Sequence, residues 1–166
     1  MINEKEKPVL AFLDELGIEY TRLEHPAAAT MDDCRFIGVE TGAKHCKNLF
    51  LTNRQGTEFF LIMIGIDKRF RTASVSKQLG VARLSFTTPE QLETILGLTQ
   101  GSVSVTGLIS DTERKVHVAI DGDVLKEEKI LIHPNINTAS LVVRTVDVVK
   151  LLNTLGYDYR TIDVLD

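Results

Sequence analysis

The chain has 166 residues, of which 43% are hydrophobic and 25% charged, with a formal net charge of −4. These values are typical of one globular domain with a single core. The acidic balance argues against broad, non-specific nucleic-acid binding, which depends on many Lys and Arg contacts to phosphates. No apolar run has the length of a membrane span, residues 1–8 lack the apolar core of a signal peptide, and two cysteines make no disulfide framework. A cytoplasmic location is therefore expected.

The first half of the chain begins with helical signals and continues with strand signals. Apolar residues at helical spacing before Gly17 predict a helix that ends there. A short strand is expected over residues 18–23, and a second helix over residues 30–37. Two apolar runs, at 47–52 and 58–64, flank a turn-like segment with a glycine. This arrangement predicts a β-hairpin.

The second half contains three predicted helices, each closed by a glycine. The first covers residues 74–79. The second has a strong start, because Thr88 is a good N-cap, Pro89 suits the first helical position, and Gln91 completes a capping box. Thr145 is expected to cap the third helix. Further strands are expected over residues 83–86, 116–120, 130–133, 140–144 and 157–165.

These strands arrive in clusters and not in strict βαβ alternation. We therefore expect an α/β fold of the α+β kind, with a mixed, mostly antiparallel, barrel-like sheet surrounded by helices. No repeat or low-complexity linker divides the chain, so one domain over residues 1–166 is expected.

Several catalytic motifs are absent from the sequence. There is no G-x-S-x-G elbow, Walker loop, dinucleotide fingerprint or H-E-x-x-H helix. The four histidines are not spaced as metal ligands from one another or from cysteine, so no metal or other cofactor is expected.

Lys47 and Asn48 form the first candidate site. Both precede the apolar run Leu49-Phe50-Leu51, so the backbone there should be rigid. A lysine at such a point can hold a phosphate or polarise a carbonyl. An edge-strand lysine that discourages aggregation is an equally good interpretation of Lys47 alone.

Two other segments offer polar groups beside apolar runs. His133, followed by Pro134 and Asn135, ends a buried-looking strand, where it could bind a ligand or serve as a structural histidine. The run from Gly101 to Ser104 lets the backbone approach a ligand closely, although an ordinary turn has the same composition.

A basic stretch follows the hairpin. It holds five of the 19 Lys and Arg residues and can be a solvated face or a local patch for an anionic partner. Its members are Lys68, Arg69, Arg71, Lys77 and Arg83.

Read together and in order, these segments resemble the YbaK/prolyl-tRNA-synthetase-associated domain family of aminoacyl-tRNA deacylases. The chain looks most like the freestanding prolyl-tRNA editing type. The segments that carry the resemblance are Gly42-Ala43-Lys44-His45-Cys46-Lys47-Asn48-Leu49-Phe50-Leu51, Arg83-Leu84-Ser85-Phe86, Gly101-Ser102-Val103-Ser104 with Gly107-Leu108, and His133-Pro134-Asn135-Ile136-Asn137-Thr138-Ala139-Ser140.

The resemblance implies hydrolysis of mischarged Ala-tRNA(Pro) without a metal or a covalent intermediate. It implies that Lys47 holds the terminal adenosine, that Asn48 fixes the ester, and that His133 shapes a small pocket for alanine. The substrate-binding set that it implies is Gly101, Ser102, Val103, Ser104, His133 and Asn135. The implied partners are the acceptor end of aminoacyl-tRNA and, beyond it, prolyl-tRNA synthetase.

One position departs from the family pattern. The glycine loop of the family commonly contains a proline where this chain has Val105. Losing a proline removes a φ constraint and leaves an N–H to satisfy, so a looser or differently shaped loop is expected. The aminoacyl group therefore stays open between alanine and another small residue such as cysteine or serine. Two non-editing alternatives are a non-catalytic tRNA- or synthetase-binding module and an unrelated small-molecule-binding domain.

Overall fold

The computed structural model describes residues 1–27 and 37–164. The helix expected over residues 30–37 falls almost wholly outside them. The strands form two sheets, which we call the small sheet and the large sheet. The small sheet has the order β1 (Thr21–Glu24), β7 (Ala139–Arg144), β6 (Lys129–Ile132). The large sheet has the order β4 (Ser85–Phe86), β2 (Cys46–Thr52), β3 (Phe59–Gly65), β5 (Val116–Asp121), β8 (Tyr159–Ile162).

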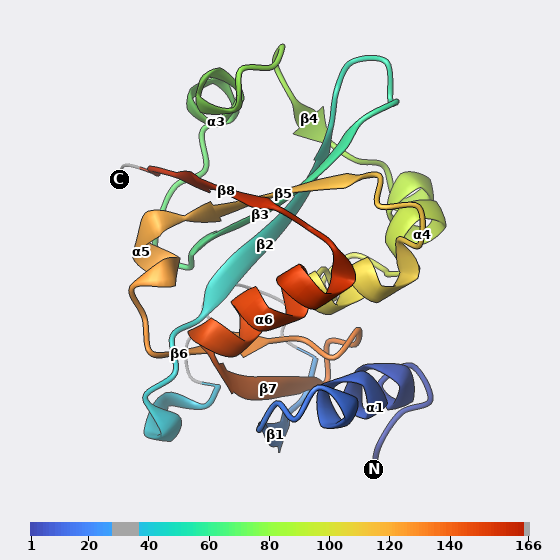
Figure 1. Cartoon of the computed structure of the whole chain (residues 1–166), viewed down its shortest axis with the longest axis vertical. Helices are drawn as coiled ribbons and strands as arrows, with labels where there is room; N and C mark the ends of the chain where they lie inside the picture. Colours follow the sequence, from blue (N-terminus) through green and yellow to red (C-terminus); the bar gives the residue numbers. More distant parts are fainter. Residues whose placement is uncertain (28–36, 165–166) are drawn as a thin grey trace.

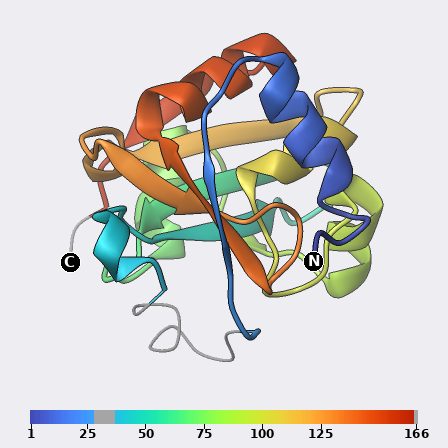
Figure 2. The ribbon, with the colours of Figure 1, turned by 90° about the horizontal axis from the view of Figure 1, so that it is seen from below.

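The helices lie between and around the sheets. Figure 1 shows the large sheet across the middle of the molecule, with α3 above it and the small sheet below, while α6 lies between them. In the view from below, α1 and α6 pack side by side (Figure 2), and Lys150 of α6 donates a hydrogen bond to the Leu16 carbonyl after α1. The helical elements are α1 (Lys7–Glu15), η1 (Val39–Thr41), α3 (Thr72–Leu79), α4 (Pro89–Leu96), η2 (Val105–Ser110), α5 (Gly122–Leu125) and α6 (Thr145–Leu155).

The mixed, mostly antiparallel character of the strands is confirmed. The β2–β3 hairpin is antiparallel, as are the pairs within the small sheet, whereas β5 runs parallel to both β3 and β8. The sheets do not close into one barrel. Among the described residues, one isolated backbone bridge, between Lys44 and Ile130, joins them, so the two sheets keep separate edges.

Local sequence signals account for the helix ends. Thr88 and Gln91 form the predicted capping box of α4, and Gly97 closes that helix in the left-handed conformation. The prediction for α6 was wrong by one residue. Arg144 is the N-cap, without a side-chain hydrogen bond, while Thr145 is the first helical residue and its buried hydroxyl has no partner among the described residues.

Two apolar clusters cover the two faces of the large sheet. The inner core fills the space between the sheets and the helices α1, α4 and α6. The outer core lies on the opposite face of the large sheet, under α3. None of the helices within residues 1–27 and 37–164 is long and apolar enough to cross a bilayer.

Candidate functional site

Strand β2 places Lys47 and Asn48 on opposite faces of the large sheet. Lys47 is paired with Ile64, a residue of the outer core, and Asn48 with Met63, a residue of the inner core. Alternation along a strand explains the difference. The two predicted residues therefore reach a common ligand only around the end of the strand, with one side chain on each side of it.

The backbone of Lys68 holds the Lys47 side chain, and the Lys68 side chain is in turn held by two ion pairs. Its ammonium donates a hydrogen bond to the carbonyl of Lys68, in the turn after β3. The Lys68 ammonium lies 2.7 Å from Asp121 Oδ2 and 2.6 Å from Asp123 Oδ2. The contact with Asp121 is an ion pair whose angles do not meet those of a hydrogen bond. Burial alone would lower the pKa of Lys68, but the two carboxylates outweigh it and raise this pKa.

Asn48 carries an unpaired amide. Its Oδ1 is buried, and the side chain makes no hydrogen bond with residues 1–27 or 37–164. Leaving a buried polar atom unpaired costs about 1–3 kcal/mol. A ligand that donates a hydrogen bond to this amide would recover part of that free energy.

Two buried serine hydroxyls hold the glycine loop, residues 101–104, through hydrogen bonds. Ser102 and Ser104 are 2% and 0% exposed. The Ser102 hydroxyl donates to the Thr99 carbonyl at 2.8 Å, and the Ser104 hydroxyl accepts a hydrogen bond from the Thr106 N–H at 3.3 Å. The looser or differently shaped loop expected from Val105 stays a prediction, and in the structure these two hydroxyls constrain the loop without a proline. The N–H groups of Val103 and Ser104 have no acceptor in the described part of the chain.

Thr106 joins this loop to the segment after β6. Its hydroxyl lies 2.7 Å from the His133 carbonyl oxygen and 2.6 Å from Asn135 Oδ1. Asn135 adopts a φ of +66°, a left-handed conformation that asparagine tolerates better than most residues. Gly101 also lies against this segment, since a Cβ there would be 3.7 Å from Asn137 Nδ2. The structure thus brings the glycine loop and the His133–Asn135 segment together.

His133 belongs to a group of three histidines. Its Nδ1 lies 3.4 Å from the Ala139 carbonyl oxygen. Burial lowers its pKa, and the charged forms of His25 and His45 lower it further, so the neutral imidazole is favoured. His25 Nε2 lies 2.8 Å from the Ser140 hydroxyl. In the described ranges, no group of three or more His, Cys, Asp or Glu side chains could hold a metal ion.

The two predicted segments meet at one end of β2. Just before that strand, the Lys44 N–H donates to the Lys129 carbonyl at 3.0 Å, and the Leu131 N–H donates to the Lys44 carbonyl at 3.0 Å. Strand β6 therefore adjoins the start of β2, as Figure 1 also shows, and it ends just before His133. His45, two residues before Lys47, interacts electrostatically with His133.

Two residues that support the site were not predicted, Thr106 and Asp121. A buried acid at the end of an alternating strand was the available signal for Asp121. Thr106 follows Ser104 in a short hydroxyl-rich run, which is too common to single it out.

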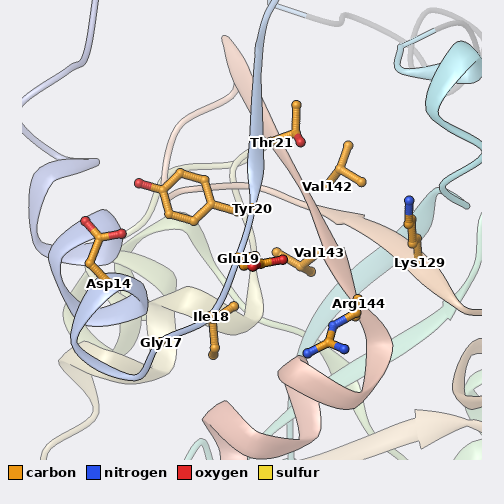
Figure 3. Close-up of a pocket in the computed structure, with 10 residues that line it drawn as sticks. All are labelled: Asp14, Gly17, Ile18, Glu19, Tyr20, Thr21, Lys129, Val142, Val143 and Arg144. Carbon is orange, nitrogen blue, oxygen red and sulfur yellow. The ribbon is translucent and has the colours of Figure 1, made fainter.

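A separate groove of about 830 Å³ lies beside α1, β1 and β7. Figure 3 shows Asp14 and Tyr20 on one side of it and Lys129 and Arg144 on the other. It contains none of the predicted site residues. Its charges are mixed, and Arg144 is paired with Asp147 at 3.0 Å. We therefore place the candidate site at the meeting point of β2 and β6.

Comparison with known proteins agrees with the resemblance found in the sequence. A family model described as an aminoacyl-tRNA editing domain matches residues 25–151. The prolyl-tRNA editing protein ProX of Acetoanaerobium sticklandii is 30% identical over 161 residues, which cover 97% of this chain and 98% of that protein. A prolyl-tRNA synthetase associated domain-containing protein of Danio rerio is 28% identical over 148 residues, covering 88% of this chain and 80% of that protein.

Solved structures share the fold. A crystal structure described as a proposed trans-editing enzyme for prolyl-tRNA synthetase superposes with a TM-score of 0.75 at 18% identity, covering 100% of this chain and 99% of that one. With the family model matching well over half of the chain, the protein belongs to the aminoacyl-tRNA editing domain family.

Proposed function

We propose that this protein is a trans-acting deacylase that hydrolyses mischarged Ala-tRNA(Pro) in the cytoplasm, with one editing domain spanning residues 1–166. The relative named a prolyl-tRNA editing protein supports this assignment. The observation that carries it is the Thr106 link, which fixes a loop with unpaired N–H groups against a half-buried histidine.

The chemistry asks little of the protein. An aminoacyl ester is already activated, so orienting water and stabilising the developing oxyanion are sufficient. The N–H groups of Val103 and Ser104, which have no acceptor in the described part of the chain, are the donors for that oxyanion, and Asn48 Oδ1 accepts a hydrogen bond from the substrate to fix the ester. A ribose hydroxyl of the substrate would assist the attack, so no Ser-His-Asp set is needed.

Lys47 is assigned to the terminal adenosine. An ammonium has three N–H donors, and the Lys68 carbonyl uses one of them. Two donors remain for the phosphate or ribose of the tRNA end. Because Lys68 is itself anchored by Asp121 and Asp123, the ammonium is held in place before the substrate arrives.

Selectivity is assigned to His133 and the glycine loop. A pocket that is too small for proline rejects it by steric overlap, whereas discrimination by a missing methylene is worth only about 1–3 kcal/mol. The neutral form of His133 avoids charge repulsion with the α-ammonium of the aminoacyl group. Prolyl-tRNA synthetase would be a partner that releases the mischarged tRNA.

One assay tests the proposal. Purified protein is incubated with Ala-, Cys-, Ser- and Pro-tRNA(Pro), and the release of free amino acid is followed for wild type, Lys47→Ala, His133→Ala and the control Lys5→Ala. We expect release of alanine only, a loss of at least tenfold with Lys47→Ala, and release of proline with His133→Ala. Lys5 is exposed and has no ion pair within the described residues, so its variant should match wild type.

Different outcomes of this assay would contradict different parts of the proposal. Faster release of cysteine or serine would move the assignment to another aminoacyl group. No release above buffer hydrolysis from any substrate would contradict the deacylase and favour a binding module.

A further inference from the structure

The residues after β3 form the most one-sided charge distribution of the chain. Positions 68–89 hold five Lys and Arg residues and no Asp or Glu, in a protein of net charge −4. Lys68 is taken up by Asp121 and Asp123. Arg69, Arg71 and Arg83 are exposed and have no ion pair within residues 1–27 and 37–164. Three exposed arginines thus carry charge that no residue in the described part of the chain pairs with.

An exposed aromatic ring lies among these arginines. Phe86 of the edge strand β4 is 60% exposed. Its ring meets that of Phe70 edge-on, with centroids 5.9 Å apart and planes inclined by 62°. This contact ties the turn that carries Arg69 and Arg71 to strand β4. An aromatic ring fixed at its edge and open elsewhere is suited to stacking on a base.

Lys47 lies on the same face of the large sheet as Phe86. Phe86 is paired with Leu51, which lies in the outer core together with the partly buried Leu49, so Phe86 and Lys47 share one face of the large sheet. Lys47 and Leu51 are four positions apart along β2, about 13 Å at roughly 3.3 Å per residue. Arg69 also follows directly on Lys68, whose carbonyl accepts the Lys47 hydrogen bond.

We propose that Arg69, Phe70, Arg71, Arg83 and Phe86, the basic-aromatic surface, bind the acceptor arm of an RNA near its single-stranded 3′ end. The arginines contact phosphates, one unpaired base stacks on Phe86, and the strand continues along β2 to Lys47. This inference rests on the proposed function, because the RNA that it places on this surface is the acceptor arm of the same aminoacyl-tRNA substrate. The combination of unpaired arginines and an open aromatic face favours RNA over an acidic protein segment.

Binding of uncharged RNA tests the surface without catalysis. Fluorescence anisotropy is measured with an acceptor-stem hairpin RNA that has a single-stranded 3′ end and with a blunt hairpin, over a range of salt concentrations. Phe86→Leu keeps an apolar contact for Phe70 but removes the stacking ring. We expect it to weaken binding of the overhang RNA about tenfold and to leave the blunt hairpin unaffected.

The contribution of the arginines is measured separately, from the salt dependence of the RNA-binding constant. The double variant Arg69→Ala/Arg71→Ala should reduce the slope of log K against log salt by roughly 1.4 to 1.8, since each phosphate contact contributes roughly 0.7 to 0.9. Lys5→Ala, which removes one charge at the far end of the chain, should leave the slope unchanged. Thermal unfolding of each variant shows that the fold is kept.

The outcomes separate this inference from the proposed function. If both surface variants bind RNA and deacylate as wild type does, RNA binding by the basic-aromatic surface is contradicted and the deacylase proposal is kept. If wild type deacylates nothing but binds RNA through these residues, the deacylase is wrong and the surface stands. RNA binding that is unchanged while binding to prolyl-tRNA synthetase is lost would overturn the RNA assignment.

Discussion

The two halves of the candidate site are positioned by different interactions. Lys47 and Asn48 lie on a strand that pairs with β3 at seven consecutive positions, from Cys46 to Thr52. The segment from His133 to Asn135 follows the last residue of β6 and is held by the Thr106 hydroxyl and by the contact of His133 with the Ala139 carbonyl. The backbone of the strand half should therefore keep its position when a single side-chain contact is lost. The position of the loop half depends on individual hydroxyl and amide groups.

The largest loss of stability and activity is expected from the side chain that anchors Lys68, and through it Lys47, in the strand half. Asp121→Asn removes a nearly fully buried carboxylate from Lys68, which keeps Asp123 as a partner. We expect the free energy of unfolding to fall by about 2–3 kcal/mol, somewhat less than for a fully broken buried pair. The Lys68 carbonyl would then hold Lys47 less firmly, so kcat should fall more than KM rises. Urea denaturation and deacylation kinetics measure both effects.

Asp123→Asn is the matched control, because its side chain is 61% exposed and contacts the same ammonium. An exposed pair contributes about 0–1 kcal/mol, so this variant should change stability little. Equal losses from the two variants would show that burial of Asp121 does not matter, and the anchoring role would fail.

In the loop half, Thr106→Val tests the dependence on one hydroxyl. The substitution keeps the shape but removes the single hydroxyl proton, which only one of the His133 carbonyl, Asn135 Oδ1 and Ser104 Oγ accepts at a time. A loss of about 1–2 kcal/mol in the free energy of unfolding is expected. Discrimination between Ala- and Pro-tRNA(Pro) should weaken as well, since the pocket wall would move. Thr154→Val, on the exposed face of α6, should stay within about 0.5 kcal/mol of wild type.

The sequence was sufficient for features set by neighbouring residues. The β2–β3 hairpin and the α4 capping box follow from turn and cap residues within a few positions of each other. The polar ends of β2 and β6 could also be recognised, because apolar runs stop there. These are local signals, and local signals do not depend on the rest of the fold.

Features that join distant segments could not be predicted. The split into two sheets depends on β1 pairing with β7, which lies more than a hundred residues later. The Lys68–Asp121 pair requires β5 to lie parallel beside β3, and nothing near Lys68 indicates that neighbour. Thr106 acquires its role only when β6 brings His133 to the glycine loop. Supporting contacts such as these were therefore missed, while the roles of the predicted site residues stay predictions.

A smaller effect is expected from the backbone of the loop half. Asn135 has a φ of +66°, which costs a residue with a Cβ about 1–2 kcal/mol unless it is asparagine or aspartate. Asn135→Gly loses the amide but fits this conformation, whereas Asn135→Ala loses both advantages. The alanine variant should therefore unfold at a lower temperature than the glycine variant. The reverse order in a thermal melt would mean that the conformation of residue 135 carries no strain.

The smallest effect concerns pH, and it again separates the two halves. The pKa of His133 and that of His45 are lowered from 6.5, chiefly because burial disfavours the charged imidazole. The unfolded chain then binds protons that the folded chain does not, so stability falls as pH decreases below about 6.5 and continues to fall until the folded-state pKa values are passed. His133→Gln should flatten this dependence, measured as urea midpoints at several pH values, relative to Thr154→Val. Deacylation by wild type should decline only at the lower end of this range, as the pH falls through the folded-state pKa of His133, because a charged His133 would repel the α-ammonium of the substrate. A decline that persists unchanged in His133→Gln would assign it to a group outside the loop half.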